Sequence, residues 1–531
     1  MITRLIIENF KAIKGRQEID LRPITLLFGP NSGGKSTIIH AIHYLRHILD
    51  RKNPNVGPEL DVLGEVNLGG FTNLVHGHVE TRDIVLGAEF KMPHPGELSE
   101  NPTLVERLRA KIDRVSLTLT IHHSDFVISR LFRVTIEVNG EPLAEFDPID
   151  PGDELQIYWR HPIFASVEFG EHPADQFQRA IEEILGVDGP MRFWREQMKT
   201  RRALGDGSSE ELENPVSVSV ATWLHGGRDY SVTDPKTLVV HCAEPATQEQ
   251  RNAANFLAQV LTPVIAEPIA YLRHYLLKDF GHLGPLRVVP SSRQMAEQRV
   301  RDETVNWYNG VAAWDMLRQP TEEDRALWSR VTDALHSLDT GLKFELSTFR
   351  DFEYTRTERD MPDRPRMPGQ LEELIHVSRD EIEQLDPQTA VEHLDRIRNA
   401  ISRLPEHVRL VITDVRTNTQ VSPQNFGVGI SQVLPVVIGA ASDMPKLFAI
   451  EQPELHIHPR LQVALGDIFI HAVKGKDRDN SYRILLIETH SEHLLLRLLR
   501  RIRQSASKMT VEERDLFTSD DLVLCHTMIL G

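Results

Sequence analysis

The sequence predicts an α/β fold that is interrupted by a long insertion of mixed α and β structure. Close to the N-terminus, strand-like runs over 3–10 and 24–28 lead into a glycine-rich turn and then into 36–48, where apolar residues recur at helical spacing. From about residue 406 onward, strand-like and helix-like segments alternate again. Alternation of this kind at both ends of a chain is typical of one α/β domain whose two parts are separated in sequence.

We expect four parts along the chain. Residues 1–95 begin the α/β domain, and 96–160 carry alternating apolar and polar runs that predict antiparallel hairpins. Residues 161–405 form an insertion that mixes helical patterns with short strand-like runs, and 406–531 complete the domain. The strands expected after the first part cover 115–121, 132–138, 216–223, 237–242, 408–415, 446–450 and 483–487, and helices begin near 430, 459 and 491.

Composition excludes several classes of protein. The 531 residues are 40% hydrophobic and 26% charged, as in ordinary globular proteins, and the longest apolar run, Val433–Ala441, is far shorter than a membrane span. The early charges and the lack of a cleavage site argue against a signal peptide. Two cysteines cannot form a disulfide framework, so a reducing cytoplasm is expected. A net charge of −17 argues against a general nucleic-acid coat but leaves a local basic face open.

The chain contains a complete phosphate-binding motif of the form G-x-x-x-x-G-K-[ST]. Its members are Gly29, Pro30, Asn31, Ser32, Gly33, Gly34, Lys35 and Ser36, followed by Thr37. The motif stands between a predicted strand and a predicted helix, where consecutive backbone N–H groups can surround phosphate oxygens. Lys35 would reach the β- and γ-phosphates, and the Ser36 hydroxyl would ligate Mg²⁺, so ATP and Mg²⁺ are expected. The alternative, a glycine-rich turn with a surface lysine, is disfavoured by the full match.

A second apolar strand ends in an acidic residue. Leu447–Ile450 is followed by Glu451, and in a parallel sheet this strand end should lie beside the phosphate-binding loop. We therefore expect Glu451 to hold Mg²⁺ directly or through water. Many strands finish with an acid, so this interpretation depends on the loop being present.

Further motifs follow in a fixed order. Phe426–Gln432 is glycine-rich and opens a helix, Pro453–Pro459 follows Glu451, and Glu488-Thr489-His490-Ser491 closes the next strand. Together they resemble the ABC-type ATPases, and most closely the SMC-related, OLD-like (overcoming lysogenization defect) branch. The sequences IEQPELHIHP and ETHSEHLLLRL carry this resemblance, which covers about 1–90 and 405–525; between them it is matched by Gly284–Arg287.

The resemblance implies a head-to-tail dimer, or a higher oligomer, with two ATP molecules between subunits. One subunit would supply the phosphate-binding loop, and the partner would supply the signature residues Gly427, Gly429 and Ser431. His490 would contact the γ-phosphate, although it could instead be an ordinary histidine at a strand end. The glycine pair could likewise be a plain junction between loop and helix. His456 and His458 read as a structural pair, since a metal site would need further ligands nearby.

Three departures from the family pattern bear on mechanism. Gln452 occupies the place of the usual catalytic glutamate, so hydrolysis should be slow or should borrow Glu454 or Glu488. Glutamine is absent between Gln17 and Gln156, which leaves Asn67 or His76 as substitutes for the usual Q-loop residue. The signature serine position is held by Gly427. Many OLD-like proteins carry a Toprim nuclease domain after the ATPase. Because 41 residues follow His490 in this sequence, we expect no such domain in this chain.

We therefore expect a cytoplasmic ATPase, without membrane contact, that dimerises around two ATP-Mg²⁺ and drives or gates a DNA-linked process. The resemblance suggests prokaryotic anti-phage defence or DNA repair, with a separately encoded nuclease or toxin as effector. An ATP-dependent switch or scaffold without hydrolysis is the main alternative. A transporter subunit is disfavoured by the long spacing between Lys35 and Gly427. A basic helix is either a solvated face or a contact for DNA or a partner; its arginines are Arg497, Arg500, Arg501 and Arg503.

Overall fold

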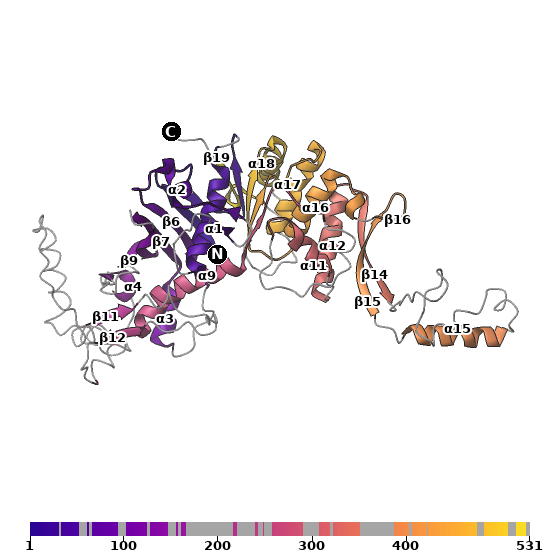
Figure 1. Ribbon diagram of the computed structural model, residues 1–531, viewed down its shortest axis with the longest axis horizontal. Helices are drawn as coiled ribbons and strands as arrows, with labels where there is room; N and C mark the ends of the chain where they lie inside the picture. Colours follow the sequence, from indigo (N-terminus) through magenta and orange to yellow (C-terminus); the bar gives the residue numbers. More distant parts are fainter. Residues whose placement is uncertain are drawn as a thin grey trace, which may run out of the picture. The chain divides into compact units, whose positions relative to one another are not determined.

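The chain forms two compact units, seen in a computed structural model (Figure 1). Unit 1 comprises 1–285, 443–455 and 466–531, and unit 2 comprises 286–442 and 456–465. The residues described are 1–30, 33–51, 61–62, 66–93, 102–124, 128–146, 156–157, 161–165, 216–219, 239–242, 248, 258–289, 307–318, 322–350, 387–402, 406–421, 423–474, 483–507 and 517–526. Asn31, Ser32 and parts of the strands expected over 216–223 and 237–242 lie outside these residues.

A five-stranded parallel sheet organises unit 1. Its order is β13 (Phe280–Leu283), β17 (Leu447–Glu451), β18 (Ile484–Thr489), β3 (Ile24–Phe28) and β19 (Leu522–His526). The three central strands are almost wholly buried, as expected for a parallel sheet that is covered on both faces. The strands expected over 24–28, 446–450 and 483–487 are thereby confirmed.

The order of this sheet corrects one expectation. The strand that ends at Glu451 was expected beside the phosphate-binding loop, but β18 lies between β17 and β3. All three strands are continuous apolar runs, so their sequences carry no information about which of them are neighbours. As a result Glu488, at the end of β18, stands on the strand next to the loop, and Glu451 is one strand further away.

The remaining structure of unit 1 includes a seven-stranded antiparallel sheet. Its order is β10 (Gln156–Ile157), β9 (Glu141–Phe146), β8 (Ile128–Val138), β7 (Arg114–Ser124), β6 (Ile84–Lys91), β1 (Ile2–Glu8) and β2 (Gln17–Asp20). The hairpin between β8 and β9 turns at Asn139 and Gly140, both with positive φ, as a tight hairpin turn requires. Within 96–160, β7, β8 and β9 pair as consecutive antiparallel hairpins, and β6 and β1 extend them into one sheet.

Helices and short strands complete unit 1. Helix α1 (Lys35–Arg51) follows β3 and packs against α9 (Glu267–Lys278). The short elements are β4 (Asp61–Val62), β5 (Val66–Asn67), α2 (Phe71–Leu74), η1 (His76–His78), α3 (Leu104–Lys111), α4 (Pro162–Ala165), β11 (Val216–Ser219), β12 (Val239–Cys242), η2 (Thr262–Ala266) and η5 (Ser519–Asp521). Helix α18 (Glu492–Ser507) follows β18, and α17 (Pro459–Lys474) has residues assigned to each of the two units.

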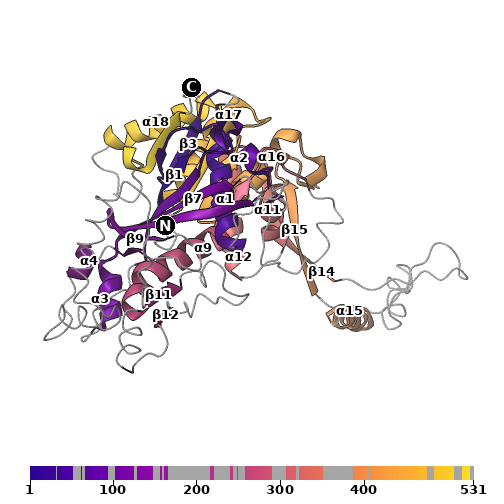
Figure 2. The ribbon, with the colours of Figure 1, turned by 60° about the vertical axis from the view of Figure 1, so that its left-hand side comes forward.

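Unit 2 is built around helix α16 (Val428–Ala441), which is buried from Val433 onward. Helices α11 (Val311–Arg318) and α12 (Glu322–Ser337) pack against α16, and α12 also packs against β14 (Leu342–Arg350). Figure 2 shows β14 paired along its length with β15 (Glu406–Asp414). The remaining elements are α15 (Pro387–Ser402), β16 (Thr419–Gln420) and η3 (Pro423–Asn425). The strand expected over 408–415 and the helix expected near 430 are confirmed.

Within the part of the chain that the structure describes, each helix is too short or too polar to cross a membrane.

Candidate functional site

The phosphate-binding loop stands between β3 and α1, and its residues other than Asn31 and Ser32 are described. Gly33 donates its N–H to the Pro30 carbonyl at 3.1 Å, and Thr37 donates its N–H to the Gly34 carbonyl at 3.1 Å. Gly34 has a φ of +84°, and a Cβ at this position would lie 2.9 Å from the Cβ of Ala12. A side chain is excluded there by both conformation and space, so this position of the loop requires glycine.

Lys35 is held inside this loop. Its side chain is 3% exposed, and its Nζ donates to the carbonyl oxygens of Gly29 at 3.1 Å and Pro30 at 2.7 Å. Among the residues with described positions, Lys35 forms no ion pair with a carboxylate. A buried ammonium group whose partners are neutral carbonyls fits a site that receives an anion, since a phosphate would supply the missing charge.

Ser36 contacts the neighbouring strand. Its Oγ donates a hydrogen bond to Oε2 of Glu488 at 2.8 Å. Glu488 is 6% exposed, and burial raises its pKa to about 7, with Glu451 and Glu454 adding to the rise while Ser36 and Lys35 oppose it. A carboxyl group with a pKa near neutrality is suited to accept or release a proton at physiological pH.

Glu451 lies next to Glu488, because the two residues are register partners on β17 and β18. Oε1 of Glu451 is 2.9 Å from Nε2 of His282, and Nδ1 of His282 is 2.9 Å from Nε2 of His43. Burial keeps the pKa of His43 well below its usual value, with nearby His282 adding to the effect, so this ring is neutral. The Glu451 carboxylate is therefore backed by two buried histidines that the sequence interpretation did not single out.

The hydroxyl of Ser36 and the carboxylates of Glu451 and Glu488 are hard oxygen donors of the kind that Mg²⁺ prefers. Within the described ranges, no group of three or more His, Cys, Asp or Glu side chains is placed to hold a metal ion by itself. A cation at this edge would therefore complete its shell with phosphate oxygens and water, as is usual for Mg²⁺ at nucleotide sites.

Gln452 leaves the strand in a left-handed conformation, with a φ of +43°. Its N–H donates to the Glu488 carbonyl at 2.7 Å, and its own carbonyl accepts from the N–H of Leu455 at 3.1 Å. This turn places an amide side chain directly after Glu451. An amide can orient a water molecule but cannot take its proton.

Glu454 links the turn that follows Glu451 to the end of β18 through two hydrogen bonds. Its Oε2 accepts from Oγ1 of Thr489 at 2.8 Å, and its Oε1 accepts from the N–H of His490 at 2.7 Å. Nε2 of His490 is buried and finds no hydrogen-bond partner among the described residues. Because Nε2 of His490 is buried and unsatisfied at the sheet edge, it is available to form a hydrogen bond with a ligand oxygen.

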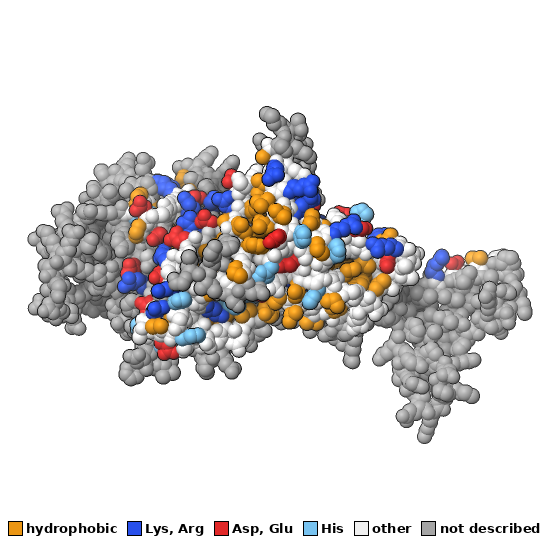
Figure 3. All heavy atoms as spheres, turned by 90° about the horizontal axis from the view of Figure 1, so that it is seen from above, with side chains coloured by type: hydrophobic (Ala, Val, Ile, Leu, Met, Phe, Trp, Pro, Cys, Tyr) orange, Lys and Arg blue, Asp and Glu red, His pale blue; other side chains and the backbone are white. Residues whose placement is uncertain are grey.

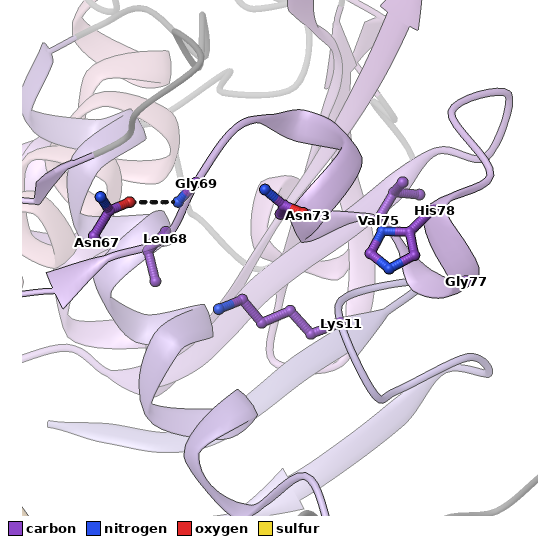
Figure 4. Close-up of a pocket in the computed structure, with 8 residues that line it drawn as sticks. All are labelled: Lys11, Asn67, Leu68, Gly69, Asn73, Val75, Gly77 and His78. Carbon is purple, nitrogen blue, oxygen red and sulfur yellow. Dashed lines mark hydrogen bonds between the residues drawn. The ribbon is translucent and has the colours of Figure 1, made fainter.

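A cavity of about 500 Å³ adjoins the helix that follows the loop (Figure 4). It is lined by Lys11, Asn67, Leu68, Gly69, Asn73, Val75, Gly77 and His78. Nζ of Lys11 is 3.0 Å from Nδ1 of His40, which belongs to α1, and burial lowers the pKa of both groups, that of His40 to about 3. Of the two residues suggested for the Q-loop, Asn67 lines this cavity and His76 does not. Nδ1 of His76 donates to the Lys11 carbonyl at 2.8 Å.

The signature residues lie in unit 2, at the start of α16. Gly427 is the N-cap residue and has open space around the position of a Cβ, and Val428 is 62% exposed. A Cβ on Gly429 would lie 2.8 Å from the His456 carbonyl oxygen. The Ser431 hydroxyl is engaged within the helix, where it donates to the Val428 carbonyl at 2.9 Å. An accessible helix start with glycine amides is thus present in this unit.

The arginines of helix α18 fall into two groups, one that forms ion pairs and one that is exposed. Arg497 and Arg501 both pair with Asp467 of α17. Arg500 and Arg503 are exposed and form no ion pair with any described residue, and Leu496 and Leu499 are exposed beside them. In the view from above, basic and hydrophobic side chains gather over α18 (Figure 3).

Two family models match the chain. The model described as "AAA domain" matches residues 4–64, and the model described as "AAA domain, putative AbiEii toxin, Type IV TA system" matches residues 301–497. Together with the loop at the end of a parallel strand, they show an α/β P-loop NTPase fold whose N-terminal and C-terminal ATPase parts are separated by a long insertion. No curated protein matches the sequence.

Solved structures similar to this chain include heads of Smc proteins. One is an Smc head bound to the C-terminal winged-helix domain of ScpA (8% identity, TM-score 0.34), and another is an Smc head with an extended coiled coil bound to the C-terminal domain of ScpA from Pyrococcus furiosus (9%, 0.34). A third is the SMC head domain from Thermotoga maritima (8%, 0.32). Each alignment covers 93% of this chain and 91% of the other.

Proposed function

We propose that this chain binds ATP-Mg²⁺ at the carboxyl edge of its parallel sheet and hydrolyses it slowly. The observation that carries this proposal is the convergence of four side chains from three strand ends. Lys35 and Ser36 follow β3, Glu488 ends β18, and Glu451 ends β17. They combine one buried cation, one hydroxyl and two carboxylates, which is the set that a triphosphate with a divalent cation requires.

The loop amides and Lys35 would hold the β- and γ-phosphates, and Lys35 would exchange its two carbonyl partners for phosphate oxygens. Ser36 and Glu451 would hold Mg²⁺, which supplies charge neutralisation between the phosphates. The cavity between Lys11 and Asn73 would receive the nucleoside. Supporting this placement, Ala12 contacts the position of a Cβ on Gly34, so the residue after Lys11 adjoins the loop.

Hydrolysis needs a base that Gln452 cannot provide. Of the two acids that could replace it, Glu454 already accepts hydrogen bonds from Thr489 and His490. Glu488 lies beside Ser36, and its pKa of about 7 suits proton transfer at neutral pH. We therefore assign the role of base to Glu488. His490, with its unsatisfied Nε2, would contact the γ-phosphate.

We further propose that ATP drives dimerisation, with Gly427, Gly429 and Ser431 of one subunit facing the nucleotide of the other. The accessible start of α16 supports this arrangement. Assignment to the OLD-like branch and a role in anti-phage defence or DNA repair belong to the same proposal, with a separately encoded nuclease or toxin as effector. The toxin named in the description of the second family model supports a defence role of this kind.

A second candidate function is an ATP-dependent switch whose output is binding rather than hydrolysis, and Gln452 is the observation that favours it. Steady-state phosphate release, measured with and without DNA, separates the two functions. Slow release that Lys35→Ala abolishes supports the ATPase. Tight ATP binding without release beyond the Lys35→Ala background supports the switch. Light scattering with ATP, ADP and no nucleotide tests dimerisation, which requires a larger mass with ATP alone.

A further inference from the structure

Two buried histidines and the partly buried Glu451, from distant parts of unit 1, form a continuous chain of hydrogen bonds that ends at the proposed metal carboxylate. His43 comes from α1, His282 from β13 and Glu451 from β17. The two contacts, His43 Nε2 to His282 Nδ1 and His282 Nε2 to Glu451 Oε1, are both 2.9 Å. His43 and His282 are 0% and 1% exposed, so neither ring is in contact with solvent.

The direction of this chain follows from hydrogen-bond chemistry. A carboxylate is an acceptor, so Nε2 of His282 carries the proton and donates it to Glu451. With its single proton on Nε2, the His282 ring has Nδ1 as an acceptor, and Nε2 of His43 donates to it. Nδ1 of His43, left without its proton, faces no donor among the residues described. Each of the two histidines is thus fixed in one tautomer by the contact that it makes toward Glu451.

We propose that His282 is a positioning residue that fixes the Glu451 carboxylate for the divalent cation, and that His43 holds His282 in place from the helix that follows the phosphate-binding loop. This inference rests on the proposed ATP-Mg²⁺ function. A carboxylate with one oxygen held by a buried, rigid donor cannot rotate freely, so its second oxygen also has a fixed position. The chain ties the metal carboxylate of β17 to α1, whose first residues are Lys35 and Ser36.

If the two histidines served only to fill the core, the unsatisfied Nδ1 of His43 would cost folding free energy without any return. Apolar residues of similar volume would pack there without leaving Nδ1 of His43 unsatisfied. The ring of His43 already packs edge-on against Phe280, with ring centroids 5.1 Å apart, so an apolar neighbour is at hand. The polar chain is explained by the group on which it ends. Outer partners of metal ligands typically change metal affinity by about 10–100-fold when they are removed.

The test compares two substitutions of His282 in the full chain. In His282→Gln the amide nitrogen can occupy the place of Nε2 and still donate to Glu451, whereas in His282→Leu the donor is lost. Mn²⁺ binding is followed by electron paramagnetic resonance in the presence of a non-hydrolysable ATP analogue, which gives a readout that is independent of turnover. We expect His282→Leu to weaken Mn²⁺ binding at least about tenfold and His282→Gln to stay within about threefold of wild type.

One control and one replacement variant complete the test. Ile42→Val removes a buried methylene group next to His43 on α1 and should leave Mn²⁺ affinity unchanged, which separates destabilisation of the helix from loss of the donor. If His282→Leu does not fold, His282→Asn replaces it, because its amide oxygen takes the place of Nδ1 as acceptor for His43, and the shorter side chain cannot reach Glu451. Mn²⁺ affinity equal to wild type in the donor-deleted variant overturns the inference. Failure of wild type to bind the ATP analogue would instead overturn the proposed function.

Discussion

The Ser36 hydroxyl donates a hydrogen bond to the Glu488 carboxylate at 2.8 Å, although the two residues are 452 positions apart in the chain. The contact exists because β18 pairs directly with β3 in the parallel sheet. It brings the candidate metal ligand that follows the phosphate-binding loop together with a buried carboxyl group from the opposite end of the sequence. The acid nearest to the loop is therefore Glu488, and Glu451 reaches the same edge from one strand further away.

Glu488→Gln should lower single-turnover hydrolysis by about 10²–10⁴-fold while ATP affinity stays within about threefold, because the amide keeps the size of the side chain but cannot accept a proton. Gln452→Glu, made in parallel, should change the rate little. A third carboxylate beside Glu451 and Glu488 adds like-charge repulsion without adding a needed base. Quench-flow measurement of product formation checks both variants. Faster hydrolysis in Gln452→Glu together with an undiminished rate in Glu488→Gln would reject Glu488 as the base.

Stability without nucleotide should fall as the pH rises toward neutrality. The pKa of Glu488 is raised from 4.5 in the unfolded chain to about 7 in the folded protein, so between these values the folded state holds the proton more tightly. The resulting stabilisation is complete below pH 4.5 and is lost as the pH rises through about 7. Denaturant titrations at about pH 5 and about pH 8 should show that Glu488→Gln loses less stability than wild type over this range. A pH-independent difference between the two proteins would contradict this assignment.

Glu454→Ala should slow hydrolysis by about tenfold or more without abolishing ATP binding, because the Thr489 hydroxyl and the His490 N–H lose their acceptor and the histidine is no longer held in place. The unfolding free energy should also drop by about 1–3 kcal/mol. Glu492→Ala, at an exposed acid in the first turn of α18, is the matched control; it should leave hydrolysis unchanged and lower the unfolding free energy by at most about 0.3–1 kcal/mol through the helix dipole. If the two variants behave alike, Glu454 does not position His490.

Filling the cavity should weaken the binding of ATP but not of tripolyphosphate. Asn73 is an exposed residue of the cavity lining, so Asn73→Phe can occupy the space without disturbing the core. We expect ATP affinity to fall at least about tenfold, since the nucleoside loses its contacts, while the phosphates keep theirs. Thr72→Phe, at an exposed neighbour outside the lining, is the control. Competition titrations with a fluorescent nucleotide measure each ligand, and an equal loss for ATP and tripolyphosphate would argue against the nucleoside assignment.

The sequence predicted the strands and the loop well because their signals are local. The bounds of β3 match the expected 24–28, since an apolar run stops at Gly29 where the loop begins. The order of β17, β18 and β3 was not predictable, because three apolar runs of similar length are interchangeable in sequence. That order decides which acid contacts Ser36. Glu451 lies at the carboxyl end of its strand, as predicted, but β18 separates that strand from β3, so Glu451 is one strand further from the loop than predicted.

Other parts of the site were missed for related reasons. The cavity around Lys11 and Asn73 is formed by loops and by very short elements, which have no periodicity to detect. His43 lies on the apolar side of α1, and His282 lies in a four-residue strand, so neither residue stands in a recognisable motif. Their hydrogen-bonded connection to Glu451 exists because the fold brings three distant segments together.

The central claim is that this sheet edge binds ATP through Lys35, and calorimetric titration of ATP with Mg²⁺ tests it most directly. Wild type and Lys14→Ala, which removes an exposed lysine of the same unit, should bind with equal affinity. Lys35→Ala should show no saturable binding, because the loop loses its buried cation. An unchanged affinity in Lys35→Ala would contradict the account.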